Sequence, residues 1–144
     1  MIYADTSVLV AYYCPEPLSR QVQELLREEA KPALSYLAEV ELVSAVARKV
    51  RTKELKGTDG NRILMKFSSH VNAGLFHVIP VECHHWQMAK DWIGYFTVPL
   101  RTLDALHLAV ASDNGLQLVT SDKSFFQAAE RFDVDARLII PGKK

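Results

Sequence analysis

The chain opens with Met1-Ile2-Tyr3-Ala4-Asp5-Thr6-Ser7, a short apolar run that stops at a carboxylate. An apolar run that ends in polar residues is typical of the carboxyl end of a buried strand. Open α/β sheets bind their ligands just beyond the carboxyl ends of the strands. We therefore predict that Asp5 lies at the mouth of a functional site and that the sheet is built around it.

The composition fits one globular domain over residues 1–144. A domain of this size buries roughly 68–70% of the surface that its unfolded chain exposes, so it needs no disulfide or structural metal. No segment approaches the roughly 18 apolar residues of a membrane span, and no basic leader precedes Val8, so we expect a cytoplasmic protein with no membrane segment. The formal net charge is zero, so any nucleic acid must bind to a local basic patch.

Short apolar runs alternate with helical patterns along the whole chain. We expect strands at residues 2–4, 33–35, 75–81, 116–119 and 137–140. We expect helices at residues 8–13, 19–30, 36–53, 61–73, 86–94, 103–111 and 124–131, the first of them capped by Thr6 or Ser7. This alternation favours an α/β fold with a parallel sheet covered on both faces.

Three further acids could converge on Asp5. Asp122 follows an apolar strand and small hydroxyl residues, which repeats the arrangement of Asp5. Asp104 lies in the first turn of a helix, where the helix dipole helps to keep it ionised. The long helix offers Glu39 or Glu41, which point about 200° apart, and its periodicity does not choose between them.

Several carboxylates close together repel each other unless a cation compensates their charge. Magnesium and manganese are hard ions that prefer oxygen ligands. Such an ion can acidify a water molecule and neutralise the charge that develops on phosphate oxygens. We therefore predict a divalent-metal site that cuts a phosphodiester.

Other polar residues have simpler interpretations. Arg48, Lys49, Arg101 and Lys123 are candidate phosphate contacts at the rim of the site, with solvated surface charge as the alternative. We interpret His107 as a packed core histidine. Cys83-His84-His85 is better explained by a surface turn than by a zinc site, because adjacent residues rarely face one ion and the sequence shows no second ligand pair.

Four motifs occur in order and resemble those of the PIN-domain family, specifically the VapC-type toxins of toxin–antitoxin pairs. They are the strand into Asp-Thr-Ser at residues 2–7, the set Ser35, Leu37, Glu41, Ser44, Ala45 and Arg48, the run Leu-Arg-Thr-Leu-Asp-Ala-Leu-His-Leu-Ala from Leu100 to Ala109, and Val119-Thr120-Ser121-Asp122. The second motif selects Glu41 over Glu39.

The resemblance implies a PIN-like three-layer α/β/α sandwich with a central parallel five-stranded sheet. It implies magnesium or manganese held by Asp5, Glu41, Asp104 and Asp122, with Ser7, Thr120 and Ser121 as polar support. The activity would be that of an endoribonuclease acting on RNA. Its partners would be a second copy of the chain, in a homodimer, and an antitoxin protein.

Three alternatives stay open. The first is a PIN nuclease that processes RNA without being a toxin. The second is a magnesium-dependent phosphohydrolase with Asp5 as the nucleophile. The third is a binding module that keeps the acids without cutting. A dehalogenase-type phosphohydrolase site wants a second Asp two residues after the first, and Ser7 stands there, which argues against it.

Overall fold

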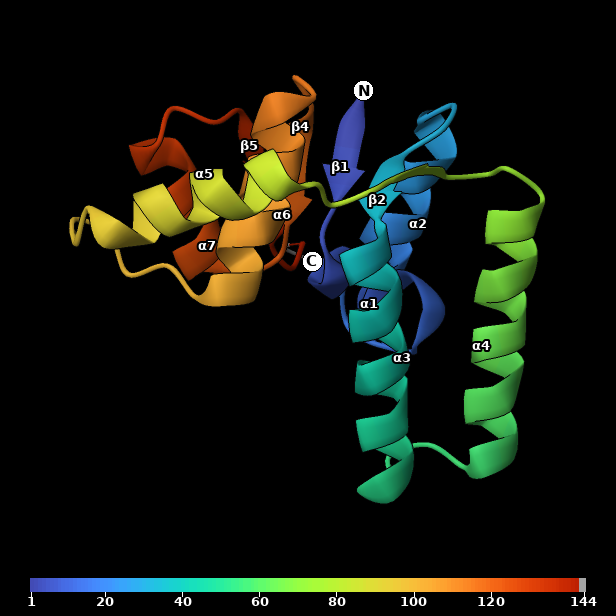
Figure 1. Cartoon of the computed structure of the whole chain (residues 1–144). Helices are drawn as coiled ribbons and strands as arrows, with labels where there is room; N and C mark the ends of the chain where they lie inside the picture. Colours follow the sequence, from blue (N-terminus) through green and yellow to red (C-terminus); the bar gives the residue numbers. More distant parts are fainter. Residues whose placement is uncertain (143–144) are drawn as a thin grey trace.

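The structure is a computed structural model that describes residues 1–142. These residues form five strands and seven helices (Figure 1). The strands are β1 (Ile2–Ala4), β2 (Ala33–Ser35), β3 (His77–Ile79), β4 (Gln117–Thr120) and β5 (Ala136–Leu138). The helices are α1 (Thr6–Tyr13), α2 (Ser19–Glu28), α3 (Tyr36–Arg51), α4 (Gly57–Asn72), α5 (Cys83–Gly94), α6 (Thr102–Asp113) and α7 (Lys123–Arg131).

All five strands run parallel in the order β3-β2-β1-β4-β5, which confirms the predicted sheet. The first strand is central: Tyr3 pairs with Ala33 on one side and with Leu118 on the other. The chain builds outward from β1 to β3, then crosses to β4 and builds outward again. The direction of strand order therefore reverses between β1 and β4, which is where open α/β sheets form their ligand crevices.

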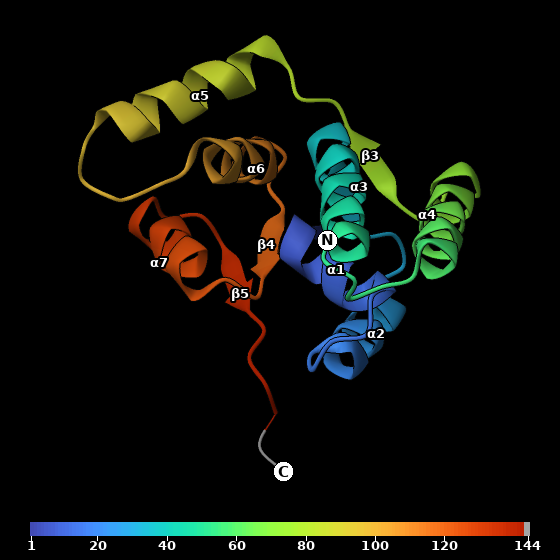
Figure 2. The ribbon, with the colours of Figure 1, turned by 90° about the horizontal axis from the view of Figure 1, so that it is seen from below.

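Alternate residues of the strands point to opposite faces of the sheet. Ile2, Ala4 and Leu34 pack in a cluster with helices α1 to α4. Tyr3 and Leu118 pack in a second cluster with residues of α6 and α7. Figure 2 shows the two groups of helices on either side of the strands. The three-layer α/β/α sandwich is thus confirmed.

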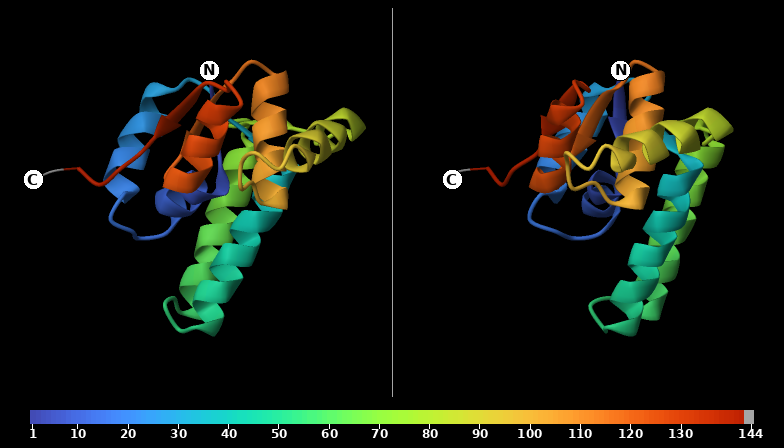
Figure 3. Two further views of the ribbon diagram at one scale, coloured as in Figure 1. Left: turned by 90° about the vertical axis from the view of Figure 1, so that its left-hand side faces the viewer. Right: turned by 60° about the vertical axis from the view of Figure 1, so that its left-hand side comes forward.

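The helices α3 and α4 run side by side and extend beyond the sheet as a pair (Figure 3). Their close approach depends on Gly60, because a Cβ atom there would lie 2.8 Å from Val50 Cγ2. The sequence prediction that α4 starts at residue 61 was wrong, since the helix begins at Gly57. Both Gly57 and Gly60 lie inside this helix, and Gly60 allows the two helices to pack closely.

Two other element boundaries differ from the prediction. The third strand covers only His77–Ile79, and Pro80, which has no N–H to donate, follows it directly. Helix α5 begins at Cys83, so the Cys83-His84-His85 segment is a first helical turn and not a surface turn. None of the helices within residues 1–142 is long and apolar enough to cross a membrane.

Candidate active site

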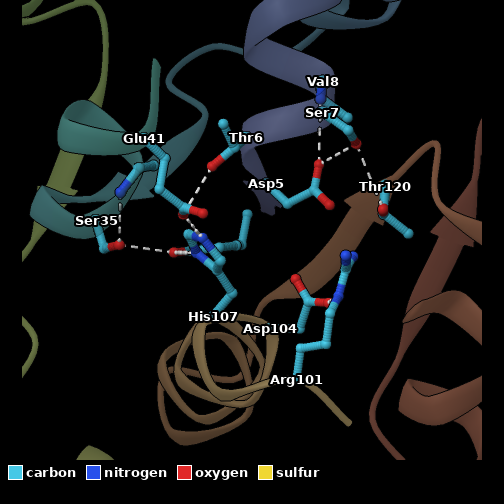
Figure 4. A network of polar contacts seen from close by, with 12 residues as sticks. Asp5, Thr6, Ser7, Val8, Ser35, Glu41, Arg101, Asp104, His107 and Thr120 are labelled. Atoms are coloured by element: carbon cyan, nitrogen blue, oxygen red, sulfur yellow. Dashed lines mark hydrogen bonds and ion pairs between the residues drawn. The ribbon is translucent and has the colours of Figure 1, made fainter. Parts of the chain in front are cut away.

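Asp5 is fixed where β1 passes into α1. Its backbone N–H donates to the Val119 carbonyl at 3.2 Å, so the residue continues the pairing of β1 with β4. Its Oδ1 atom accepts the Val8 N–H at 3.1 Å and the Ser7 hydroxyl at 2.5 Å (Figure 4). Asp5 is therefore the N-cap of α1, and the prediction of a Thr6 or Ser7 cap was wrong.

The Asp5 carboxyl is buried, with 5% of the residue exposed. Burial raises its pKa above the ordinary value, and hydrogen bonds from Ser7, Thr120 and the Val8 N–H, together with the charge of His107, offset only part of this effect. A carboxylate in this setting ionises at a cost in free energy that a nearby cation would remove.

Asp122 and Asp104 lie together through a shared arginine. Asp122 is the N-cap of α7, where its Oδ1 accepts the Phe125 N–H at 3.1 Å. Its Oδ2 accepts from Arg101 Nη2 at 3.1 Å. Asp104, in the first turn of α6, accepts from Arg101 Nε, also at 3.1 Å. The Arg101 guanidinium thus bridges two predicted metal ligands.

The pKa of Asp104 is raised, mainly because the carboxyl is partly buried. The charge and hydrogen bond of Arg101 and the charge of His107 act in the opposite direction, while the negative charge of Asp122 adds to the increase. Asp104 and Asp122 are therefore close enough to repel each other, and Arg101 offsets part of that repulsion.

Glu41 reaches the same region from α3. Its Oε1 accepts the Thr6 hydroxyl at 2.9 Å and contacts His107 Nε2. Burial raises the pKa of Glu41, but the hydrogen bond and the charge of His107 act in the opposite direction. The lowering effects prevail together, so the pKa lies below the ordinary value. The pKa of Glu39, on another face of the helix, is raised by burial. The structure thus places Glu41, rather than Glu39, in this polar network.

A buried hydrogen-bond chain holds Glu41 in place. The Tyr3 hydroxyl donates to Ser35 Oγ at 2.8 Å, so it accepts from His107 Nδ1, which lies 2.6 Å away. The opposite ring nitrogen, Nε2, faces Glu41 (Figure 4). His107 is buried as predicted, with 2% of the residue exposed, but it also positions a candidate ligand. The sequence signal was its three-residue spacing from Asp104 on a helix.

The small hydroxyl residues tie the two strand ends together. Ser7 Oγ accepts the Ser121 N–H at 3.1 Å and lies 3.5 Å from Thr120 Oγ1. Thr120 Oγ1 accepts the Asp122 N–H at 3.0 Å. Ser7 and Thr120 therefore link the end of β1 to the end of β4. Ser121 joins this network through its backbone N–H.

The other predicted cations have different surroundings. Lys49 forms ion pairs with Glu16 and Glu54, each at 3.3 Å, and 18% of its side chain is exposed. Arg48 is exposed seven residues after Glu41, about 10 Å further along α3. Lys123 is exposed at the start of α7, directly after Asp122. Arg101 is the one predicted cation that the structure brings into contact with the acids.

The acids fit a hard divalent cation. Carboxylates from the β1 end, α3, α6 and the α7 N-cap offer only oxygen atoms, which magnesium and manganese prefer. The guanidinium of Arg101 shows that positive charge is already accommodated there. Within residues 1–142, none of these acids belongs to a group of three with ligand atoms within 4.8 Å of one another. A set of ligands that is this widely spaced suits an ion that keeps part of its water shell.

One group of three potential ligands does lie that close: His84, His85 and Asp113. The two Nε2 atoms are 2.7 and 2.9 Å from Asp113 Oδ2. However, the Glu82 N–H donates to His85 Nδ1, so a neutral His85 carries its proton on Nε2 and gives it to Asp113. A neutral His85 then has no lone pair on Nε2 to offer an ion, which favours a hydrogen-bonded tie between α5 and α6.

The comparisons with known proteins agree with this geometry. The model of the PIN domain matches residues 2–131, and the chain therefore belongs to the PIN domain family. FitAcB from Neisseria gonorrhoeae is similar in structure, with a TM-score of 0.73 and 23% identity over 94% of this chain and 96% of that chain. A search by sequence among curated proteins found no significant match.

Two further solved structures share the fold. VapC20 from Mycobacterium tuberculosis, described as a sarcin–ricin loop cleaving toxin, has a TM-score of 0.73 and 17% identity over 89% of this chain and 95% of that chain. A toxin–antitoxin complex from Klebsiella pneumoniae has a TM-score of 0.67 and 17% identity over the full length of both chains. At these identities the likeness shows the fold.

Asp5→Asn is expected to stabilise the metal-free chain at neutral pH. The folded-state pKa of Asp5 is raised, so its ionisation destabilises the fold increasingly as the pH rises through that pKa. Asparagine keeps the helix cap without the charge. In EDTA at pH 7 the melting temperature should rise by a few degrees, and the difference should vanish below about pH 4.

The control for that measurement is Asp59→Asn. Asp59 is an exposed acid in the first turn of α4, and solvent screens its ion pair with Arg62. It should change the melting temperature little. A lower melting temperature for Asp5→Asn in EDTA would show that the buried charge is already compensated within the chain.

His107→Ala is expected to lower the free energy of unfolding by about 1–3 kcal/mol, because it removes one hydrogen-bond partner each from Tyr3 and Glu41. Denaturant unfolding measures this loss. Binding of Mn²⁺ should weaken about tenfold, as for other groups that orient a ligand. His77→Ala removes an exposed histidine of β3 and serves as the control. Unchanged Mn²⁺ affinity in His107→Ala would remove the positioning role.

Proposed function

We propose that the chain is a divalent-metal-dependent endoribonuclease and the toxin of a toxin–antitoxin pair. The observation that carries the proposal is that Asp5, Glu41 and Asp104 lie in one polar region at the switch point of the sheet (Figure 4), where Arg101 joins Asp104 to Asp122. Membership of the PIN family and the likeness to toxin structures support a nuclease.

Magnesium or manganese would be held by these four acids. When bound, the ion would acidify a water molecule and offset the charge on the phosphate oxygens. The protein's own part is preorganisation. Ser7 and Thr120 orient Asp5, while Thr6 and His107 fix Glu41, so that the carboxylates need little rearrangement when the substrate arrives.

RNA would be held by a local rim, since the net charge of the chain is zero. Arg101 and Lys123 flank the acids directly, and Arg48 lies further along α3. Their exposed side chains can each contact a phosphate. Lys49 contributes less to such a rim because Glu16 and Glu54 already neutralise it.

The proposed partners are an antitoxin protein and a second copy of the chain. The similar structure from Klebsiella pneumoniae is a toxin–antitoxin complex, which supports an antitoxin partner. In this chain, Tyr36, Val40 and Val43 form an exposed apolar stripe on one face of α3. A stripe of this kind supports a protein interface.

The alternatives named from the sequence are less well supported. An Asp5 nucleophile would need an accessible carboxylate, but its Oδ1 atom is occupied by Ser7 and Val8 and the residue is buried. A PIN nuclease that processes RNA without an antitoxin would use the same acids, so the partner, and not the site, distinguishes it.

RNA cleavage is expected to require the metal and the acids. The purified chain should cut a mixed pool of transfer and ribosomal RNA into discrete products with Mg²⁺ or Mn²⁺, and not with EDTA. Asp104→Asn or Asp122→Asn should lose activity on the order of a hundredfold, because each removes charge that holds the ion. Gel electrophoresis of the products provides the measurement.

Asp59→Asn is the matched control for that experiment, since Asp59 pairs with Arg62 three residues on, as Asp104 pairs with Arg101 in the reverse direction. It should keep full activity. Full activity in Asp104→Asn would contradict the assignment, and cleavage in EDTA would contradict the dependence on a metal.

Arg48→Ala is expected to weaken RNA binding by removing a phosphate contact, with a shallower dependence of affinity on salt. Fluorescence anisotropy at several salt concentrations, in an Asp122→Asn background that prevents cleavage, measures this. Lys49→Ala should instead lower stability, because it leaves Glu16 and Glu54 unpaired. An unchanged salt dependence in Arg48→Ala would assign that residue to the solvated surface.

A further inference from the structure

The side chain of Arg101 is highly exposed and still bridges two elements of the structure. Its side chain is 77% exposed, yet the guanidinium bonds two acids that belong to different helices. Nε lies 3.1 Å from Asp104 Oδ2, and Nη2 lies 3.1 Å from Asp122 Oδ2. Figure 4 shows the guanidinium beside Asp104, on the side of the site that faces Asp5 and Thr120.

Arg101 bonds the carboxylate oxygen atoms that a divalent ion would also need as ligands. The Oδ1 atom of Asp122 is used by the α7 N-terminus, so Oδ2 is the oxygen that it can offer to an ion. Arg101 bonds that same oxygen and one from Asp104. The positive charge of Arg101 also acts on Glu41. The pKa of the guanidinium is raised most by Asp104, less by Asp122 and least by Glu41.

We propose that Arg101 is an internal counter-cation that occupies the metal position in the metal-free protein and is displaced when the divalent ion binds. The inference rests on the proposed function and adds a regulation of the same site. Metal loading becomes an exchange of one cation for another, so the acids are at no stage left to repel each other uncompensated.

The exchange is physically easy for Arg101. Exposed ion pairs are weak, because water and salt compete for both partners. A divalent ion brings twice the charge to the same oxygens. Once released, the guanidinium remains at the N-cap of α6 beside the site, and its planar fork suits bidentate binding of a phosphate. Metal binding would thus release the Arg101 guanidinium from the two carboxylates and allow it to bind a phosphate of the RNA.

An ordinary surface pair in the same chain provides the contrast. Arg62 pairs with Asp59 at the same three-residue separation, and its side chain is 80% exposed. Among residues 1–142 it forms an ion pair with Asp59 alone, at 3.6 Å. Arg62→Ala therefore removes an equally exposed charge without opening the proposed position.

Calorimetric titration with Mn²⁺ and with Mg²⁺, without RNA, tests the proposal on the full chain. Arg101→Ala should bind each ion about threefold to tenfold more tightly than the wild-type chain, since the competing cation is gone. Arg62→Ala should bind as the wild type does. Equal affinity in Arg101→Ala and the wild type would overturn the proposal.

A second readout separates displacement from a general effect of charge. In a spectrum of ¹⁵N-labelled protein, the Arg101 Nε signal is identified by its loss in Arg101→Ala. It should shift on titration with Mg²⁺ at the midpoint found by calorimetry, while the Arg62 signal stays in place. An Arg101 signal that does not move at saturating Mg²⁺ would overturn displacement.

The two failures can be told apart. If neither the wild-type chain nor Arg101→Ala binds a divalent ion, the proposed function itself is contradicted. If both bind with one affinity, the metal site stands and only the role of Arg101 is lost.

Discussion

The rest of the site depends on the burial of the Asp5 carboxylate. The residue follows the central strand of a parallel sheet, and its backbone is still paired with β4. Its side chain must therefore lie where the ends of β1 and β4 meet, inside the protein rather than in solvent. The α1 N-terminus and the Ser7 and Thr120 hydroxyls support the charge, yet the pKa remains raised. Such a carboxylate favours any cation that can approach it.

The surroundings of the acids divide into a hydrogen-bonded inner part and an exposed outer part. The hydroxyl links between Ser7, Thr120 and Asp122, and the buried chain from Tyr3 through His107 to Glu41, hold the acids in place from within. On the solvent side, the exposed Arg101 supplies positive charge without being packed. A site built this way would keep its geometry when a divalent ion replaces Arg101, as we propose.

The parallel strands and the placement of Asp5 and Asp122 could be predicted from sequence, because they follow from local patterns. The run before Asp5 and the similar run before Asp122 identify two parallel strands whose ends must share one edge of the sheet. The choice of Glu41 over Glu39 came from a motif and not from periodicity, because the deciding contact joins Glu41 to His107, 66 positions away. Asp113 beside His84 and the bridging by Arg101 depend on tertiary placement in the same way, so no local signal indicates them.

The most direct test of the account is anomalous diffraction from a crystal of the chain soaked in Mn²⁺. We predict one strong peak among Asp5, Glu41, Asp104 and Asp122, with the Arg101 guanidinium turned away from both of its carboxylate partners. A peak at His84 and Asp113 with none at the four acids, or Arg101 still bridging Asp104 and Asp122 in the loaded crystal, would contradict it.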